Sequence, residues 1–161
     1  MAVEAEHLVA LLRRAWQGEW YGVRVYGELA SVREDPTERA ALLELVVLET
    51  YVLGELTVAL MALGFEPLMG DVEAEADADL AAHRADDWPT LVQWLQRDAE
   101  VALGEYLPMR DLTASDPSLS GVAQLVVAHE EALISFAQRT LAGQAGALDD
   151  VRALIGQDGH S

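Results

Sequence analysis

The sequence of 161 residues contains no cysteine. Disulfide bonds, thiolate metal sites and cysteine nucleophiles are therefore excluded within this chain. Basic residues are also scarce, because 10 of them face 28 acidic residues and the formal net charge is -18. Such a charge repels phosphate backbones and anionic lipid surfaces. We therefore expect neither a nucleic acid nor a membrane as a partner.

Long uninterrupted apolar runs are missing as well. The most apolar stretch, residues 40–65, is interrupted by Glu44, Glu49 and Glu55, so no run approaches the length needed to cross a bilayer. The first residues are acidic where a secretory signal would carry positive charge. We expect a cytoplasmic protein. Its 161 residues, 52% of them hydrophobic, suffice for one domain with a single core.

The sequence has no strand pair joined by a tight hairpin turn, and it has no phosphate-binding glycine loop, nucleophile elbow or EF-hand loop. Instead, apolar residues recur with the 3.6-residue period of an amphipathic helix. This pattern predicts an all-α protein. We expect its long helices at residues 4–32, 36–63, 88–112 and 116–141.

The connections between these segments predict how the helices are arranged. The link over residues 33–36 is so short that the first two helices must be antiparallel neighbours. Residues 65–87 are acidic and weakly periodic, so we interpret them as a long crossover between two helical hairpins. Pro108 should bend the third helix. In the tail, residues 143–161, we expect a short helix near residues 148–155 that packs loosely or frays.

The two halves of the chain carry carboxylates at matched places. Asp-Pro pairs start the second and fourth helices, and Glu49 and Glu130 each lie 13 residues after the proline, Pro36 or Pro117. Their neighbours one helical turn away are apolar, and Glu19 shares an apolar stripe on the first helix in the same way. Three helices thus each direct one carboxylate toward the core.

Carboxylates gathered in a dry core repel one another, which raises their pKa values and favours protonation. A shared divalent cation resolves this conflict, and carboxylate oxygens suit iron, manganese or magnesium. The alternative is structural. In that case each glutamate reaches the edge of its stripe or bonds to a tyrosine such as Tyr26 or Tyr51.

The third helix offers three candidates for a fourth acid, Asp98, Glu100 and Glu105. Asp98 lies on an apolar stripe. Glu100 matches the first half of the chain best, because it lies 17 residues before the next helix-starting proline, as Glu19 does. We choose Glu100 and expect a bend or bulge near Pro108 to rotate it inward.

Three segments of the sequence, "EWYGVRVYGELA", "LETYVLGEL" and "AHEEALISFAQ", carry a resemblance to a known family. They resemble the first, second and fourth helices of the ferritin-like superfamily, in particular the rubrerythrin-type and related small di-iron carboxylate proteins. The resemblance implies a ferritin-like four-helix bundle. It also implies one or two ions of iron or manganese held by core acids, which would here be Glu19, Glu49, Glu100 and Glu130.

The chain departs from this family at both expected histidine ligands. Val52 and Leu133 stand three residues after the core glutamates, where the family carries histidine. His129 is either a displaced metal ligand, a partner of a ligand, or an ordinary core histidine.

Two functions remain open on this evidence. The first is a metal protein that activates dioxygen or oxidises ferrous iron, and the second is a metal-free scaffold of the same fold. The apolar circumference of the second helix suggests a homodimer in either case.

Overall fold

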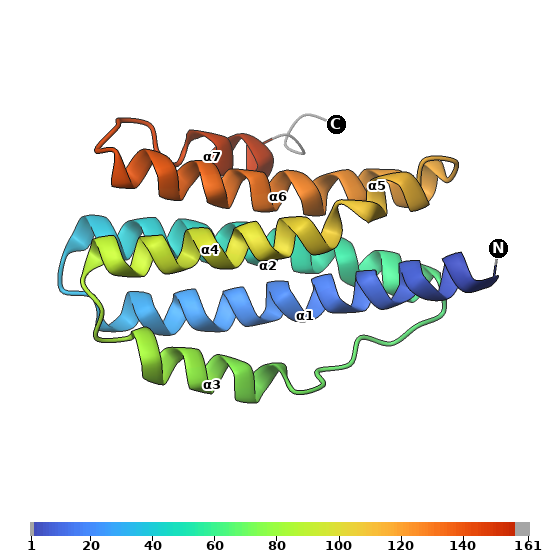
Figure 1. Ribbon diagram of the computed structural model, residues 1–161, viewed down its shortest axis with the longest axis horizontal. Helices are drawn as coiled ribbons and strands as arrows, with labels where there is room; N and C mark the ends of the chain where they lie inside the picture. The colour runs from blue at the N-terminus through green and yellow to red at the C-terminus, as the bar shows by residue number, and fades with distance from the viewer. Residues whose placement is uncertain (1, 157–161) are drawn as a thin grey trace.

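The computed structural model describes residues 2–156, and the side chains of residues 5–156. This part of the chain is helical and contains no strand, which confirms the predicted all-α class (Figure 1). In chain order the helices are α1 (Ala2–Val32), α2 (Pro36–Ala62), α3 (Val72–His83), α4 (Trp88–Tyr106), α5 (Pro108–Leu112), α6 (Pro117–Leu141) and α7 (Asp149–Gly156).

Four long helices, α1, α2, α4 and α6, run alongside one another and enclose the core (Figure 1). The main packing partners are α1 with α2 and α4 with α6, and α2 also contacts α6. The short helices lie on the outside, α3 against α1 and α7 against α6 and α2. Figure 1 shows that α1 and α2 run in opposite directions, as the short link between them predicts.

The helix ends follow the local sequence signals. Asp35 accepts hydrogen bonds from the backbone N–H groups of Thr37 and Glu38, and Asp116 accepts one from Ser118. A proline follows each of these aspartates at the first helical position, where a missing N–H costs nothing. After α2, Gly64 takes a positive φ of 79°, which suits glycine and ends the helix.

The expected third helix is divided at Pro108. Helix α4 ends at Tyr106, Leu107 links the two segments, and Pro108 opens the short α5. The axis therefore changes only after α4 is complete. Because α4 has no interruption before Tyr106, the residues in its middle keep the positions around the axis that a regular helix gives them.

The crossover differs from the prediction because it contains a helix. Helix α3 buries Val72, Ala76 and Leu80, and the Tyr21 hydroxyl of α1 donates a 2.6 Å hydrogen bond to Asp79. The first two turns of α3 each bury one apolar side chain of small or medium size, Val72 and Ala76, and most residues between them are acidic. That composition hides the helical period in the sequence.

The C-terminal helix packs more firmly than expected. Val151 of α7 is fully buried, and Arg152 donates two hydrogen bonds to Glu44 of α2, at 2.7 and 2.6 Å. Ser135 of α6 also donates to Asp150 at 2.6 Å. These contacts hold α7 against both α2 and α6.

Helix α2 is the most apolar element. By length and composition it could cross a membrane, although 39% of its most apolar window is buried within the protein and core helices of globular proteins pass the same test. One face of α2 contributes to the core and also carries Glu49. The opposite face is exposed.

Candidate metal centre

The structure brings Glu19 of α1, Glu49 of α2 and Glu130 of α6 together in the interior. Each of the three residues is at most 5% exposed. Their helices pack against one another around the core, so each carboxylate follows the buried face of its own helix inward. An isolated carboxylate in such a place is costly unless a proton, a hydrogen bond or a cation compensates it.

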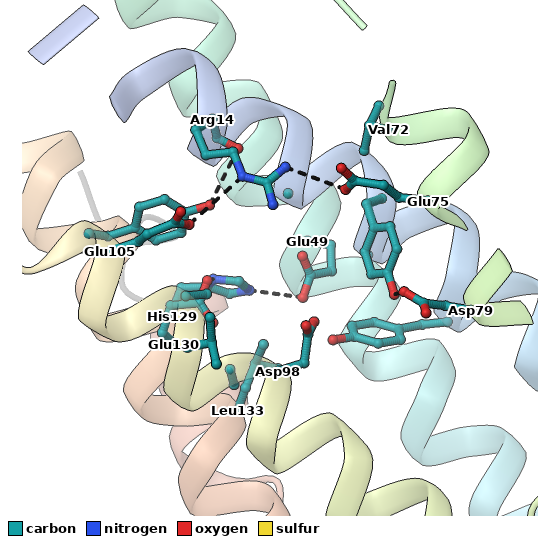
Figure 2. A pocket seen from close by; sticks show the side chains of 18 residues that line it. Arg14, Glu49, Val72, Glu75, Asp79, Asp98, Glu105, His129, Glu130 and Leu133 are labelled. Carbon is teal, nitrogen blue, oxygen red and sulfur yellow. Dashed lines mark hydrogen bonds and ion pairs between the residues drawn. The ribbon is translucent and has the colours of Figure 1, made fainter. Parts of the chain in front are cut away.

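His129 lies among these carboxylates. Its Nε2 is 2.9 Å from Glu49 Oε1 (Figure 2). Its Nδ1 is 3.3 Å from Glu19 Oε1 and 3.6 Å from Glu130 Oε1. The buried face of α6 is broad enough to direct two successive residues inward, which explains why both His129 and Glu130 are buried. His129 is therefore in direct contact with the acidic cluster.

Two buried atoms of this cluster have no hydrogen-bond partner. Glu19 Oε2 and His129 Nδ1 are inaccessible, and neither makes a hydrogen bond among the described residues. Ligand atoms of Glu19, Glu49 and His129 all lie within 4.8 Å of one another, close enough to share a single ion. A buried polar atom without a hydrogen bond costs about 1–3 kcal/mol. The carboxylates of Glu19 and Glu130 offset part of this cost at His129 Nδ1, and a bound cation that contacts Glu19 Oε2 and His129 Nδ1 would offset the remainder.

The cluster perturbs the ionisation of its own members. Burial alone lowers the pKa of His129, but the facing carboxylates of Glu19, Glu49 and Glu130 leave that pKa well above its usual value. Burial raises the pKa of Glu19 strongly, and nearby His129 only partly offsets it. Burial also raises the pKa of Glu130. The site therefore retains protons unless another cation replaces them.

A cavity of about 110 Å³ adjoins the cluster. Glu49, His129 and Glu130 line its inner part, together with the buried Tyr26 and Tyr106. Burial first, and then the charge of Glu49, raises the pKa of Tyr26 well above its usual value. Both tyrosines therefore stay protonated and present hydroxyl groups to the cavity.

Asp98 of α4 also faces this cavity. Figure 2 shows its carboxylate pointing toward Glu49, although the residue as a whole is exposed at the mouth of the cavity. Partial burial, and then the negative charges of Glu130, Asp79 and Glu49, raise its pKa to about 6. Asp98 is thus the α4 acid that joins the site.

Glu100, the predicted fourth acid, is not brought to the site. Its side chain is exposed and accepts a 2.8 Å hydrogen bond from Gln96 on the same helix. The expected inward rotation does not occur, because α4 is interrupted only after Tyr106. The apolar stripe of Asp98 was the better signal. The matched spacing of Glu100 was misleading.

Glu105, the third candidate, lies at the outer wall of the cavity. Arg14 contacts both Glu105, at 3.8 Å, and Glu75 of α3, at 3.5 Å (Figure 2). Arg14 therefore partly neutralises the wall and links α1 to α3 and α4. These side chains are close to half exposed, so each contact contributes little to stability.

Gly22 makes room for the carboxylate of Glu49. A Cβ atom at this position would lie 2.5 Å from Glu49 Cδ, closer than real Cβ atoms approach. A side chain on α1 would thus displace the Glu49 carboxylate from His129. The absence of a side chain at position 22 is part of the site, although the sequence pattern gave it no such role.

The two positions at which the resembling family carries histidine hold apolar side chains that lie in or near the site. Val52 is fully buried, and Leu133 lines the cavity below Glu130 (Figure 2). His129 is therefore the only imidazole in the cluster formed by the described residues.

No protein-family model, curated protein or solved structure matches this chain. The geometry and chemistry of the cluster are therefore the basis on which a function is inferred.

Proposed function

We propose that the chain is a ferritin-like four-helix bundle that binds a divalent metal ion, iron or manganese, through Glu19, Glu49 and His129. Glu130 and Asp98 would complete the ligand set. The observation that carries this proposal is the pair of buried atoms without hydrogen bonds, Glu19 Oε2 and His129 Nδ1, within a group whose ligand atoms lie within 4.8 Å.

The chemistry of these donors fits the proposed ions. Carboxylate oxygen combined with imidazole nitrogen suits iron and manganese. The charges fit as well, because Glu19, Glu49 and Glu130 when ionised would together carry more negative charge than the imidazolium of His129 can balance. A divalent cation would supply the missing positive charge, and His129 would bind it as a neutral imidazole after losing its proton.

The size of the cavity limits what can react there. About 110 Å³ holds a few water-sized molecules, whereas sites for drug-sized organic ligands occupy about 300–1,000 Å³. We therefore propose that the small molecule reaching the site is water or dioxygen, or that ferrous iron itself is the substrate. Bound iron or manganese would supply the redox chemistry, and the protein residues would hold the ion and keep bulk water away.

A second candidate is a metal-free scaffold, and one observation favours it. The His129 ring already lies between Glu49 and Glu19, at 2.9 and 3.3 Å, so its imidazolium can act as an internal counter-charge. Val52 and Leu133 stand where the resembling family carries its histidines. In this case the carboxylates would be held by protons and by His129 alone.

Metal content and metal affinity distinguish the two candidates. Protein purified without chelator is analysed for bound elements, and the metal-free form is titrated calorimetrically with Mn²⁺ and, without oxygen, Fe²⁺. The Glu49→Gln variant should lose about 10–100-fold in affinity, since it keeps the volume but loses the charge of a ligand. Glu100→Gln is the matched control, because it removes an exposed acid outside the cluster.

The two candidates predict opposite results in this experiment. Negligible metal in the wild-type protein, with no binding on titration, would remove the metal proposal and leave the scaffold. Equal binding by the wild type and Glu49→Gln would place the metal elsewhere on this acidic protein.

A further inference from the structure

The exposed face of α2 carries a continuous stripe of uncharged residues, on the side of the helix opposite to Glu49. We call this the outer stripe. Its residues are spaced three or four apart along the helix and therefore lie on one face, and they are Leu43, Val47, Thr50, Gly54, Val58 and Met61. The four large apolar members are between 49% and 67% exposed.

The apolar surface continues from α2 onto α1. Trp16 of α1 donates a 2.9 Å hydrogen bond to Thr57, which borders the outer stripe. A Cβ atom on Gly27 of α1 would lie 4.0 Å from Val46 of α2, so the two helices are in close contact here. Trp20 and Val23, on the same face of α1 as Trp16, are half-buried. The apolar surface of α2 thus continues onto α1 at Trp16 and Val23, and it ends near Trp20, where the guanidinium of Arg24 lies over the ring at 5.9 Å.

The charge of the molecule argues against several kinds of partner. With a net charge of -18, the chain repels nucleic acids and anionic lipids. The outer stripe itself has no charge. Of the acids beside it, Glu44 is paired with Arg152, and the exposed Glu55 lies about 100° around the helix from Gly54 of the stripe. Two copies could therefore meet at this stripe without placing like charges against each other at its centre.

The positions of the stripe residues are self-complementary. They are arranged almost symmetrically about residue 52, so that Leu43 corresponds to Met61 and Thr50 to Gly54, while Val47 and Val58 correspond to within one residue. A twofold axis at this point would place two antiparallel α2 helices together and set each residue against its counterpart. Such a self-matching patch is what a twofold interface requires.

We propose that the outer stripe of α2, with the neighbouring face of α1, is the interface of an antiparallel twofold homodimer. The area supports the participation of both helices. Helix α2 has 27 residues and is therefore about 40 Å long and about 10 Å wide, which gives about 400 Å². A stable interface needs about 800 Å² from each partner, so the adjoining face of α1 supplies the remainder.

Sedimentation equilibrium on the full chain tests the dimer. The wild type should have twice the mass of one chain. The double variant Val47→Glu and Val58→Glu should dissociate at least about 100-fold more readily, because charges would be buried without partners at the centre of the interface. The matched control is Val101→Glu on α4, since Val101 is 69% exposed and Val58 is 67% exposed.

Cross-linking tests the antiparallel arrangement independently of those variants. The chain has no native cysteine, so Leu43→Cys and Met61→Cys provide unique thiols for a short bifunctional maleimide. A mixture of the two single variants should form cross-linked pairs, and neither variant alone should do so. In the proposed dimer the two copies of position 43 are 18 residues apart along the paired helices, or about 27 Å.

Several results would overturn the proposal. A monomeric wild type excludes the dimer, and a monomer that binds vesicles of neutral phosphatidylcholine would assign the stripe to lipid instead. A dimer that survives both glutamate substitutions in a folded variant uses another surface. Efficient cross-linking of Leu43→Cys with itself would indicate parallel helices. If the double variant does not fold, the cross-linking pattern decides.

Discussion

At the scale of single residues, the site depends on a glycine, Gly22, as much as on its acids and its histidine. The Glu49 carboxylate reaches His129 by lying against the backbone of α1 at Gly22, where a Cβ atom would lie 2.5 Å from Glu49 Cδ. Glycine is costly inside a helix, by about 1 kcal/mol relative to alanine. Its presence in the middle of α1 is explained by this close approach.

Gly22→Ala should therefore weaken both the fold and the proposed metal site. We expect the steric conflict to cost about 1–3 kcal/mol in the free energy of unfolding, of which the higher helix propensity of alanine offsets about 1 kcal/mol. Mn²⁺ binding should be at least about tenfold weaker because Glu49 must move. Chemical denaturation and calorimetric titration measure the two effects. Gly27→Ala is the control, since its new Cβ would only touch Val46 at 4.0 Å. A stability loss in both variants alike would contradict the explanation.

Asp98 should make the stability of the metal-free protein depend on pH. Its folded pKa of about 6 exceeds the ordinary value of 3.8, so the folded state binds this proton more tightly than the unfolded state. The resulting stabilisation is present below 3.8 and is lost as the pH rises through about 6. Asp98→Asn stays neutral and should be the more stable protein above that interval.

Urea denaturation in the presence of chelator measures this effect at a series of pH values. The advantage of Asp98→Asn over the wild type should grow across the interval from 3.8 to about 6. Glu100→Gln on the same helix is the control, because Glu100 does not line the cavity. An advantage that is constant or shrinks with rising pH would refute the assignment of Asp98 to the cavity wall.

At the scale of elements, α3 is held against α1 by one short apolar row and by polar contacts, among them the ion pairs of Arg14 with Glu75 and of Arg24 with Asp77. It packs on α1 through a short apolar row that includes the fully buried Ala76, and it is linked to α1 by the Tyr21–Asp79 hydrogen bond. Helices of this length are marginal without tertiary contacts. Because α3 also contributes Glu75 and Asp79 to the cavity wall, its attachment controls how closed the cavity is.

Ala76→Asp should release α3 while the long helices stay folded. A charge at this buried position has no partner, so we expect the amide protons of α3 to exchange with solvent at least about tenfold faster, which corresponds to about 1.4 kcal/mol. Hydrogen exchange followed by mass spectrometry measures this rate. Ala81→Asp adds the same charge at an exposed position of α3 and should leave the exchange rate nearly unchanged. Equal acceleration in both variants would mean that charge alone loosens α3.

At the scale of the whole molecule, the dominant feature is the net charge of -18. Like charges on a compact surface repel one another and reduce the stability of the folded state. Salt screens this repulsion, because the Debye length falls from about 30 Å at 0.01 M to about 3 Å at 1 M ionic strength. The compact protein should therefore gain more from screening than the expanded unfolded chain.

We expect the thermal midpoint of the metal-free protein to rise by several degrees as NaCl increases over this range. A gain of about 1 kcal/mol corresponds to about 2–4 °C for a protein of this size. Differential scanning calorimetry measures the midpoint, and KCl should reproduce the change, since screening depends on ionic strength alone. A falling midpoint would mean that attractive ion pairs outweigh the net repulsion.

Much of the fold could be predicted because the signals are local. The Asp-Pro pairs, the glycine after α2 and the apolar period gave the long helices, with starts and ends close to those observed. Helix α3 escaped because acids and alanines obscure its period. The position of the bend was also uncertain, because a proline can kink a continuous helix or begin a new one, and Pro108 begins α5.

The sequence by itself determined that carboxylates on α1, α2 and α6 would be buried, because a glutamate between apolar turns has no other face to occupy. The tertiary structure was needed to choose the α4 acid, because Asp98 and Glu100 lie about 200° apart around the helix and only Asp98 lines the cavity. It alone also placed His129 between Glu19 and Glu49 and set Gly22 beneath Glu49. Periodicity fixes which way a side chain points from its own helix, whereas contacts between helices depend on how those helices pack.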